Sequence, residues 1–295
     1  MASVDSFVSK FICGDCVSVL RNIDDDSVSL VVTSPPYADQ RDYGVDGTKI
    51  KADDYVEWFM PKAQEIYRIL KPNGSFVLNI NDKVVDGFQH LFVFRLVLAL
   101  CDSIGFHLVR DYIWHNPATP PNVYSRGTHG RTKKSHEYCF WFSKGDTWTF
   151  NMDPIRRPYK DGMSKLIDSE HCSGHRVTRP STHNFDCGKP WRNHGGADPG
   201  TVLSIANTGS RGVFMDLCKE KGVLHPARFP EKLVEFFILA GSNEGDVVLD
   251  PFSGSGTTAV VAARHGRQWI GVDASSAFCD LAEARLAMEG FATKR

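Results

Sequence analysis

The stretch VVTSPPY, residues 31–37, decides how the rest of the chain is interpreted. Its valines and threonine are typical of the end of a buried strand, because β-branched side chains favour extended backbone. The two prolines fix φ and lack an N–H, so the strand ends in a stiff turn. This turn carries the Ser34 hydroxyl, the carbonyls of Ser34 and Pro35, and the Tyr37 ring. These groups suit a flat ligand that bears an amine, although a plain proline-stiffened loop would look the same.

A second informative stretch is PFSGSGTTA, residues 251–259, which joins a predicted strand at 247–250 to a predicted helix ending near Arg264. Glycines in such a turn let the backbone approach a nucleotide, and a helix N-terminus offers free N–H groups to it. Asp273 ends the next predicted strand and is placed to accept hydrogen bonds from ribose hydroxyls. The pattern fits NAD or S-adenosylmethionine. It lacks a P-loop lysine, which excludes nucleoside-triphosphate hydrolysis.

The position of the second stretch predicts how the two stretches meet. Only one further βα unit follows it, so a complete sheet needs the upstream strand at residues 27–33. The carboxyl ends of parallel strands share one edge of a sheet, and ligands bind there. We therefore expect residues 34–37 to lie beside residues 252–256, with cofactor and target between them.

The order of elements predicts an α/β fold: a Rossmann-like, mostly parallel sheet with helices on both faces, plus an irregular inserted target-recognition region. Helices are expected at 53–70, kinked or divided by Pro61, and at 88–103, nearly all apolar and therefore buried. A further helix is expected at 230–240, and Ser275 is expected to cap the last one. The other predicted strands are residues 11–15, 75–80, 106–114, 137–142 and 268–273.

Composition is that of a globular protein of one large or two modest domains: 295 residues, 42% hydrophobic and 23% charged. MASVDSFVSK has no apolar signal segment, and the longest apolar run, LFVFRLVLAL, is too short for a membrane span. Eight scattered cysteines favour free thiols in a reducing, cytosolic setting. Cys13 and Cys16 are interpreted as packing residues.

Positive charge gathers in the middle of the chain. Residues 110–211 carry a net charge of +6, although the whole chain carries −1. Residues 125–134 and 151–207 are basic and lack apolar periodicity, which is typical of a surface that contacts phosphates, or of a solvated loop. Cys172, His175, His183 and Cys187 have roughly zinc-ligand spacing without clean C-x-x-C pairs, and no metal is expected. The basic and aromatic candidates for reading DNA are Arg156, Arg157, Tyr159, Lys160, Arg176, Arg179, Phe185, Lys189, Trp191 and Arg192.

Together, TSPPY, the basic insertion and DPFSGSGTT resemble the β group of DNA amino-methyltransferases, in which the cofactor motif comes last. Further matching pieces are CGD (13–15), LKPNGSFVLNI (70–80), HPARFPEKL (225–233) and GVD (271–273). The resemblance implies three parts. Residues 1–150 form the catalytic half, residues 151–222 the target-recognition insertion, and residues 223–295 the cofactor-binding half.

The resemblance also implies methyl transfer from S-adenosylmethionine to the exocyclic amine of a base flipped out of double-stranded DNA. In that reading, the Ser34 hydroxyl and the Pro35 carbonyl accept the amine protons, Pro36 sets the turn and Tyr37 stacks on the base. Asp15 contacts the adenine of the cofactor, although it also suits a turn cap. The remaining cofactor-binding residues are Asp250, Phe252, Gly254, Ser255, Gly256, Thr257 and Asp273.

SPPY is similar to the cytosine-N(4) enzymes, so we expect cytosine N(4) as the acceptor. The alternatives are adenine N(6), an RNA or protein-amide substrate, a non-catalytic DNA-binding protein, and an NAD-dependent dehydrogenase. No membrane partner is expected, and the expected location is the cytoplasm, with the nucleoid. The sequence leaves open a homodimer and a cognate restriction endonuclease as partners.

Overall fold

The computed structural model describes residues 3–38, 50–119, 130–168, 192–207, 213–223 and 229–293. It divides into two units, Met1–Phe150 with Thr201–Arg295, and Asn151–Gly200. Strand β8 (Val202–Ser204) pairs with the sheet of the first unit. The expected target-recognition insertion at residues 151–222 stays a prediction.

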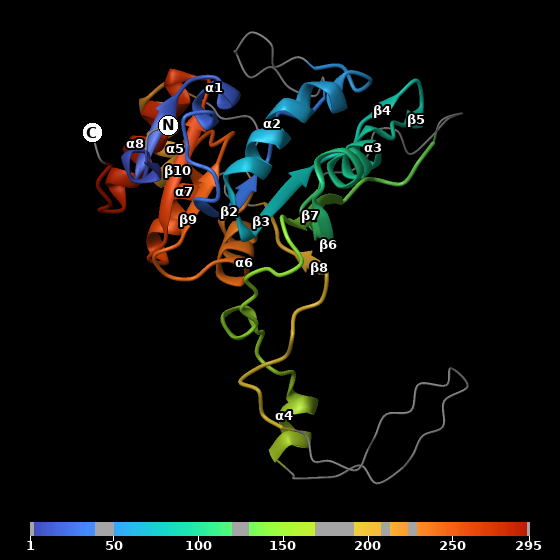
Figure 1. The fold of residues 1–295 in the computed structure, drawn as a ribbon. Helices are drawn as coiled ribbons and strands as arrows, with labels where there is room; N and C mark the ends of the chain where they lie inside the picture. Colours follow the sequence, from blue (N-terminus) through green and yellow to red (C-terminus); the bar gives the residue numbers. More distant parts are fainter. Residues whose placement is uncertain are drawn as a thin grey trace. The chain divides into compact units, whose positions relative to one another are not determined.

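The first unit is built on one eight-stranded sheet with the order β1-β10-β9-β2-β3-β7-β6-β8 (Figure 1). The strands from β1 to β3 are parallel, β7 runs antiparallel to β3 and β6, and β8 is parallel to β6. This confirms the predicted mostly parallel α/β sheet. The strand bounds are β1 (Lys10–Cys13), β2 (Val28–Thr33), β3 (Leu70–Ile80), β6 (His107–His115), β7 (His136–Ser143), β9 (Val247–Asp250) and β10 (Gln268–Asp273).

Strand β2 lies at the centre of the sheet, and all six of its residues are buried. Because side chains alternate along a strand, its two faces meet different helices. Val31 belongs to the core shared with α2, whereas Leu30 lies against Gly241 of α6. The sheet is thus covered on both faces, as predicted. The helices are α1 (Cys16–Leu20), α2 (Tyr55–Ile69), α3 (Phe92–Ala99), α5 (Val213–Glu220), α6 (Glu231–Gly241), α7 (Thr257–Arg264) and α8 (Ser276–Met288).

One helix prediction needs correction, and another is narrowed. Helix α2 runs through Pro61 without division, so of the two expected outcomes only a kink remains. Helix α3 begins at Phe92 rather than at residue 88, because Asp86 and Gly87 both have positive φ and turn β4 (Val84–Val85) into β5 (Phe88–Gln89). The helix ends in a π-helical turn, Leu100–Ile104, and it is not fully buried, since Leu98 is 60% exposed. The predicted Ser275 cap is confirmed, since its side chain accepts from the Phe278 N–H.

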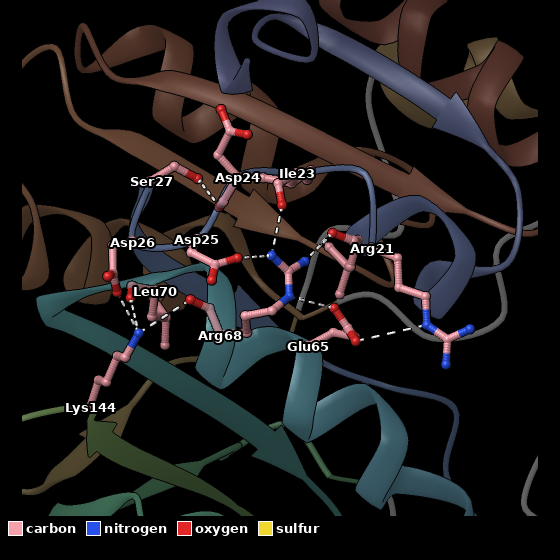
Figure 2. Close-up of polar contacts among 11 residues, drawn as sticks. Arg21, Ile23, Asp24, Asp25, Asp26, Ser27, Glu65, Arg68, Leu70 and Lys144 are labelled. Carbon is pink, nitrogen blue, oxygen red and sulfur yellow. Dashed lines mark hydrogen bonds and ion pairs between the residues drawn. The ribbon is translucent and has the colours of Figure 1, made fainter. Parts of the chain in front are cut away.

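An ionic cluster fixes the end of the sheet opposite the two motifs (Figure 2). Arg68, on α2, donates to the carbonyls of Leu20 at 2.7 Å and Ile23 at 2.9 Å, in the segment that leads into β2. It also pairs with Glu65 at 2.9 Å and with Asp25. One guanidinium therefore ties α2 to the chain just before the central strand.

The described cysteines are all free. Cys16 is buried on α1, as expected for a packing residue, and burial raises the pKa of its thiol to about 11. Cys13 is exposed, which differs from the expected packing role. Within the described ranges, none of the helices has the length and apolar character needed to cross a membrane.

Candidate active site

The two motif-bearing strands, β2 and β9, are neighbours in the sheet (Figure 1). Val31 is in register with Leu249, so both strands end at the same edge. The Thr33 hydroxyl donates to Asp250 Oδ1 at 2.6 Å. The predicted meeting of the SPPY turn (residues 34–37) and the glycine loop (residues 251–256) at one sheet edge is therefore observed.

Asp250 is enclosed beneath this junction rather than open to a ligand. It is 1% exposed and accepts hydrogen bonds from Thr33, from Thr258 Oγ1 at 2.7 Å and from the Phe252 N–H at 3.0 Å. Burial raises the pKa of its carboxyl group to about 6, against the opposing effect of these donors. Asp250 therefore lies enclosed beneath the glycine loop, and its part in cofactor binding stays a prediction.

The SPPY turn is held by hydrogen bonds on both sides. Ser34 is partly buried, and its Oγ lies 3.1 Å from the Tyr37 hydroxyl oxygen. That hydroxyl donates to Glu137 Oε2 at 2.6 Å and lies 3.2 Å from Asn79 Oδ1. From the other side, the Tyr55 hydroxyl of α2 donates to the Pro36 carbonyl at 2.9 Å. The Tyr37 ring is only 5% exposed, so stacking on a base stays a prediction.

Close packing explains the glycines in and around the glycine loop, which is also the predicted cofactor loop. Gly254 and Gly256 have φ of 50° and 74°, a region that favours glycine. A Cβ at Gly256 would lie 2.9 Å from atoms of both Phe11 and Ala282. A Cβ at Gly271 of β10 would lie 2.5 Å from the Phe11 ring. Neither position has room for a side chain.

Buried polar side chains hold the rest of the loop. Arg285, which is 4% exposed, donates to the Ser255 carbonyl and the Thr257 hydroxyl, each at 3.0 Å. Asp273 accepts from the Gly254 N–H at 2.8 Å and the Ser275 N–H at 2.9 Å. Burial raises the pKa of the Asp273 carboxyl group. The predicted cofactor residues at 254–257 and 273 thus lie together.

Asp15 and Phe252 complete the set of predicted cofactor residues. Asp15 caps α1, accepting from the Ser18 N–H and hydroxyl at 2.9 Å each, which is the capping role that the sequence left open. Its contact with adenine stays a prediction. Phe252 is partly buried beside the Trp58 ring, with ring centroids 5.8 Å apart.

This donor set fits an organic nucleotide-like cofactor. The loop offers glycine backbone, the Phe252 ring and the Asp273 carboxylate. The Ser253 hydroxyl is buried and has no partner among the described residues, so a polar ligand atom would satisfy it. No cluster of three or more metal-ligating side chains occurs in the ranges that the structure describes. Cys172, His175, His183 and Cys187 lie outside those ranges.

The second unit, Asn151–Gly200, gathers several of the basic candidates. Arg157 and Ala197 form an antiparallel bridge, and α4 (Asp161–Asp168) follows. A cavity of about 530 Å³ is lined by basic, aromatic and apolar residues and by one carboxylate, among them Arg156, Arg157, Tyr159, Lys160, Met163, Ile167, Arg192, His194 and Asp198. Arg176, Arg179, Phe185, Lys189 and Trp191 lie outside the described residues, as do residues 125–129.

Sequence reasoning missed the residues that surround the SPPY turn. Tyr55, Asn79 and Glu137 come from three different elements, α2, β3 and β7. Nothing in their local sequence marks them, because only the folded sheet brings them to Tyr37. Thr33 and Thr258 could have been suspected, since each belongs to one of the two motifs.

Comparison with known proteins was made for sequence and structure. A family model described as DNA methylase matches residues 28–284. The type II methyltransferase M.PvuII of Proteus hauseri is 38% identical over 267 residues, which are 87% of this chain and 77% of that protein.

Two solved structures resemble the fold closely. A PvuII DNA methyltransferase, named as cytosine-N4-specific, superposes with a TM-score of 0.70 at 29% identity, covering 92% of this chain and 84% of that one. TTHA0409 of Thermus thermophilus, in complex with S-adenosyl-L-methionine, superposes with a TM-score of 0.59 at 26% identity, covering 96% of this chain and 98% of that one.

Proposed function

This chain belongs to the DNA methylase family, and we propose that it transfers a methyl group from S-adenosylmethionine to the exocyclic N4 amine of cytosine in duplex DNA. The observation that carries this proposal is the junction of the SPPY turn and the glycine loop, linked by Thr33 and Asp250. Two reacting molecules bound on either side of this junction would meet at one sheet edge.

In this reaction the protein places hydrogen-bond acceptors next to the cytosine amine, which is a weak nucleophile. The lone pair of the cytosine amine is delocalised into the ring. The Ser34 hydroxyl oxygen and the Pro35 carbonyl accept the amine protons and stabilise positive charge as it develops on nitrogen. Bound S-adenosylmethionine supplies an activated methyl group on a sulfonium. The transfer would exchange the S–CH₃ bond for an N–CH₃ bond with S-adenosylhomocysteine as the leaving group, and the proton displaced from the nitrogen would pass to solvent water.

The cofactor would be held by the residues gathered at the glycine loop. The backbone of residues 254–257 surrounds its methionine part, Phe252 packs on it, Asp273 binds the ribose and Asp15 the adenine amine. Asp250 keeps the loop in place from beneath, through Thr258 and the Phe252 N–H. Tyr37 is assigned the stacking on the flipped base, with its hydroxyl still hydrogen-bonded to Glu137.

Two observations support cytosine over adenine. The acceptor at the start of the turn is Ser34, and SPPY is similar to the motif of the cytosine-N4 enzymes. The PvuII DNA methyltransferase, which has a similar structure, is named as cytosine-N4-specific. Adenine N6 is the second candidate, since the family covers both reactions.

The test is to methylate plasmid DNA with purified protein and labelled S-adenosylmethionine, and to identify the modified nucleoside by mass spectrometry. We expect N4-methylcytosine in one sequence context and none in RNA. N6-methyladenine would overturn the choice of base. Absence of any methylated nucleoside, together with failure to bind S-adenosylmethionine, would favour a non-catalytic DNA-binding protein.

The insertion is proposed to read the DNA sequence. Arg157 and Lys160 line the cavity of the unit Asn151–Gly200, and cations of this kind contact phosphates and base edges. Loss of either should weaken DNA binding and reduce its salt dependence.

The type II name of M.PvuII supports a cognate restriction endonuclease as a partner, acting with this enzyme on DNA in the cytoplasm. Sedimentation would test for a homodimer.

A further inference from the structure

Glu137 lies 100 positions from Tyr37 in the sequence, yet its Oε2 accepts the Tyr37 hydroxyl proton at 2.6 Å. We propose that Glu137 is a positioning residue, which sets the direction of the hydrogen bonds through Tyr37 so that Ser34 presents lone pairs to the target amine. This inference rests on the proposed function. It adds a residue from β7, outside both motifs.

The strand pairing places Glu137 and Asn79 on the same side of the turn. Asn79 of β3 is opposite Cys139 of β7, and Glu137 is two residues before Cys139. Side chains two positions apart on a strand share a face. Glu137 and Asn79 therefore converge on the Tyr37 hydroxyl from adjacent strands.

The two side chains that reach the Tyr37 hydroxyl from β3 and β7, Asn79 and Glu137, both present acceptors. A carboxylate has no proton to donate. The Asn79 amide nitrogen donates to the Tyr138 carbonyl at 3.2 Å and lies 3.5 Å from Cys139 Sγ, so its oxygen faces Tyr37. Tyr37 has one hydroxyl proton, and it must point toward this acceptor pair.

The direction of the Ser34 contact follows from this. With its proton committed, the Tyr37 oxygen can only accept in the 3.1 Å contact with Ser34. Ser34 therefore donates to Tyr37, and its lone pairs are left for the amine protons of the base. Without an acceptor at position 137, the chain could run the other way, with Ser34 accepting from Tyr37. The Ser34 oxygen would then have fewer lone pairs with which to accept the amine protons of the base.

The experiment compares Glu137→Gln, Tyr37→Phe and the double variant, with Asp111→Asn as a matched control. Asp111→Asn removes one exposed carboxylate from β6, the neighbouring strand. Glutamine keeps the size of Glu137 but can turn an N–H toward Tyr37. We expect Glu137→Gln to lower kcat about tenfold or more with KM for S-adenosylmethionine within about twofold. The control should match the wild type.

A double-mutant cycle separates positioning from general damage. If Glu137 acts through the Tyr37 hydroxyl, adding Glu137→Gln to Tyr37→Phe should change kcat by less than about twofold. If the kcat of the double variant falls by the product of the two single-variant losses, the proposal is overturned. A Glu137→Gln variant that keeps more than half of the wild-type kcat would also overturn it. A wild type that yields no methylated nucleoside would refute the proposed function itself, which is a different result.

A spectroscopic measurement needs no activity and covers the case of a variant that folds poorly. A hydroxyl proton donated over 2.6 Å to a carboxylate should give a downfield proton resonance in the wild type, absent in Tyr37→Phe. Its presence supports the stated direction. If no such resonance is found in folded wild-type protein under slow-exchange conditions, the proposal is overturned.

Discussion

Thr33 and Asp250 share a 2.6 Å hydrogen bond, although 217 positions separate them in the sequence. Thr33 directly precedes the SPPY turn, to which we assign catalysis, and Asp250 directly precedes the glycine loop, to which we assign cofactor binding. The bond is buried, so it exchanges little with water and fixes one loop relative to the other. Alignment of cofactor and base should depend on it.

Thr33→Val tests this link, because valine has nearly the shape of threonine but no hydroxyl. The buried Asp250 carboxylate would lose one of its donors, which should reduce the free energy of unfolding by about 1 to 3 kcal/mol. Thr258→Val removes the other hydroxyl and serves as the matched control. Chemical denaturation should show similar losses for both variants. Thr258 holds Asp250 from the side of the glycine loop, so Thr258→Val should weaken binding of S-adenosylmethionine, whereas Thr33→Val should reduce kcat at saturating cofactor. Equal kcat values for the two variants at saturating cofactor would contradict the coupling.

Asp250 predicts a distinctive dependence of stability on pH. Its folded-state pKa of about 6 lies above its ordinary value, so the folded protein holds this proton more tightly than the unfolded chain does. The penalty for the buried charge is therefore full above pH 6 and disappears as pH falls toward 4. Asp250→Asn has no such titration.

We therefore expect the unfolding free energy of Asp250→Asn, minus that of the wild type, to fall by up to roughly 3 kcal/mol between pH 7 and pH 4. Urea denaturation across that range measures it. Taking the difference removes the titrations that both proteins share. A difference that rises with falling pH would show that the carboxylate is net stabilised in the folded state.

Ser34→Ala should separate catalysis from cofactor binding. Loss of one acceptor at the amine should lower kcat about 100-fold, while the Kd for S-adenosylmethionine changes by less than about twofold. Single-turnover methylation and calorimetry give the two quantities. Equal losses in both would show that Ser34 supports the cofactor site and not the reacting nitrogen.

Gly271→Ala tests the packing behind the cofactor loop. The new methyl group would overlap the Phe11 ring and lie 2.7 Å from Ser253 Oγ, so β1 or the loop must shift. We expect a loss of about 1 to 3 kcal/mol in stability and weaker binding of S-adenosylmethionine. Gly200→Ala, where nothing lies within 4 Å, is the control and should bind the cofactor like the wild type.

Arg68→Ala should affect stability alone. Its guanidinium makes several hydrogen bonds at the entry to β2 (Figure 2). Ser34 follows the other end of that strand. We expect a loss of about 2 to 3 kcal/mol with kcat unchanged in folded protein. Arg21→Ala provides the comparison, because Arg21 is exposed and its nearest Glu65 oxygen is 3.8 Å away. A comparable loss from Arg21→Ala would contradict the importance of the buried carbonyl contacts.

The strands could be predicted well because each carries its signal locally. Residues 27–33 and 247–250 are short apolar runs next to proline or glycine. Because the carboxyl ends of parallel strands share one edge of a sheet, these two ends could be expected to lie together. The start of α3 was misjudged, because the Asp86–Gly87 turn outweighed the apolar character of the residues after it. Pro61 lies inside a helix that tertiary packing keeps whole.

The site was predictable only where it coincides with a motif. Asp250 was recognised by its position before the glycine loop, but its enclosure by Thr33 and Thr258 depends on the sheet. Glu137 lies in the strand of EYCFWF and was seen only as the start of that strand. Its contact with Tyr37 depends on β7 running antiparallel to β3, which the alternation of strands and helices did not indicate.

The pairing of β1 with β10 also bears on how the protein is made in the cell. Lys10 leaves the ribosome 260 residues before Ile270, its partner in the sheet. The sheet of a nascent chain therefore lacks this pairing while the residues between β1 and β10 are translated. A premature stop codon before residue 268 would leave β9 with an uncovered edge, and exposed edges of this kind pair with other chains. Such a truncation should accumulate as aggregate or be degraded, rather than act as a weakened enzyme.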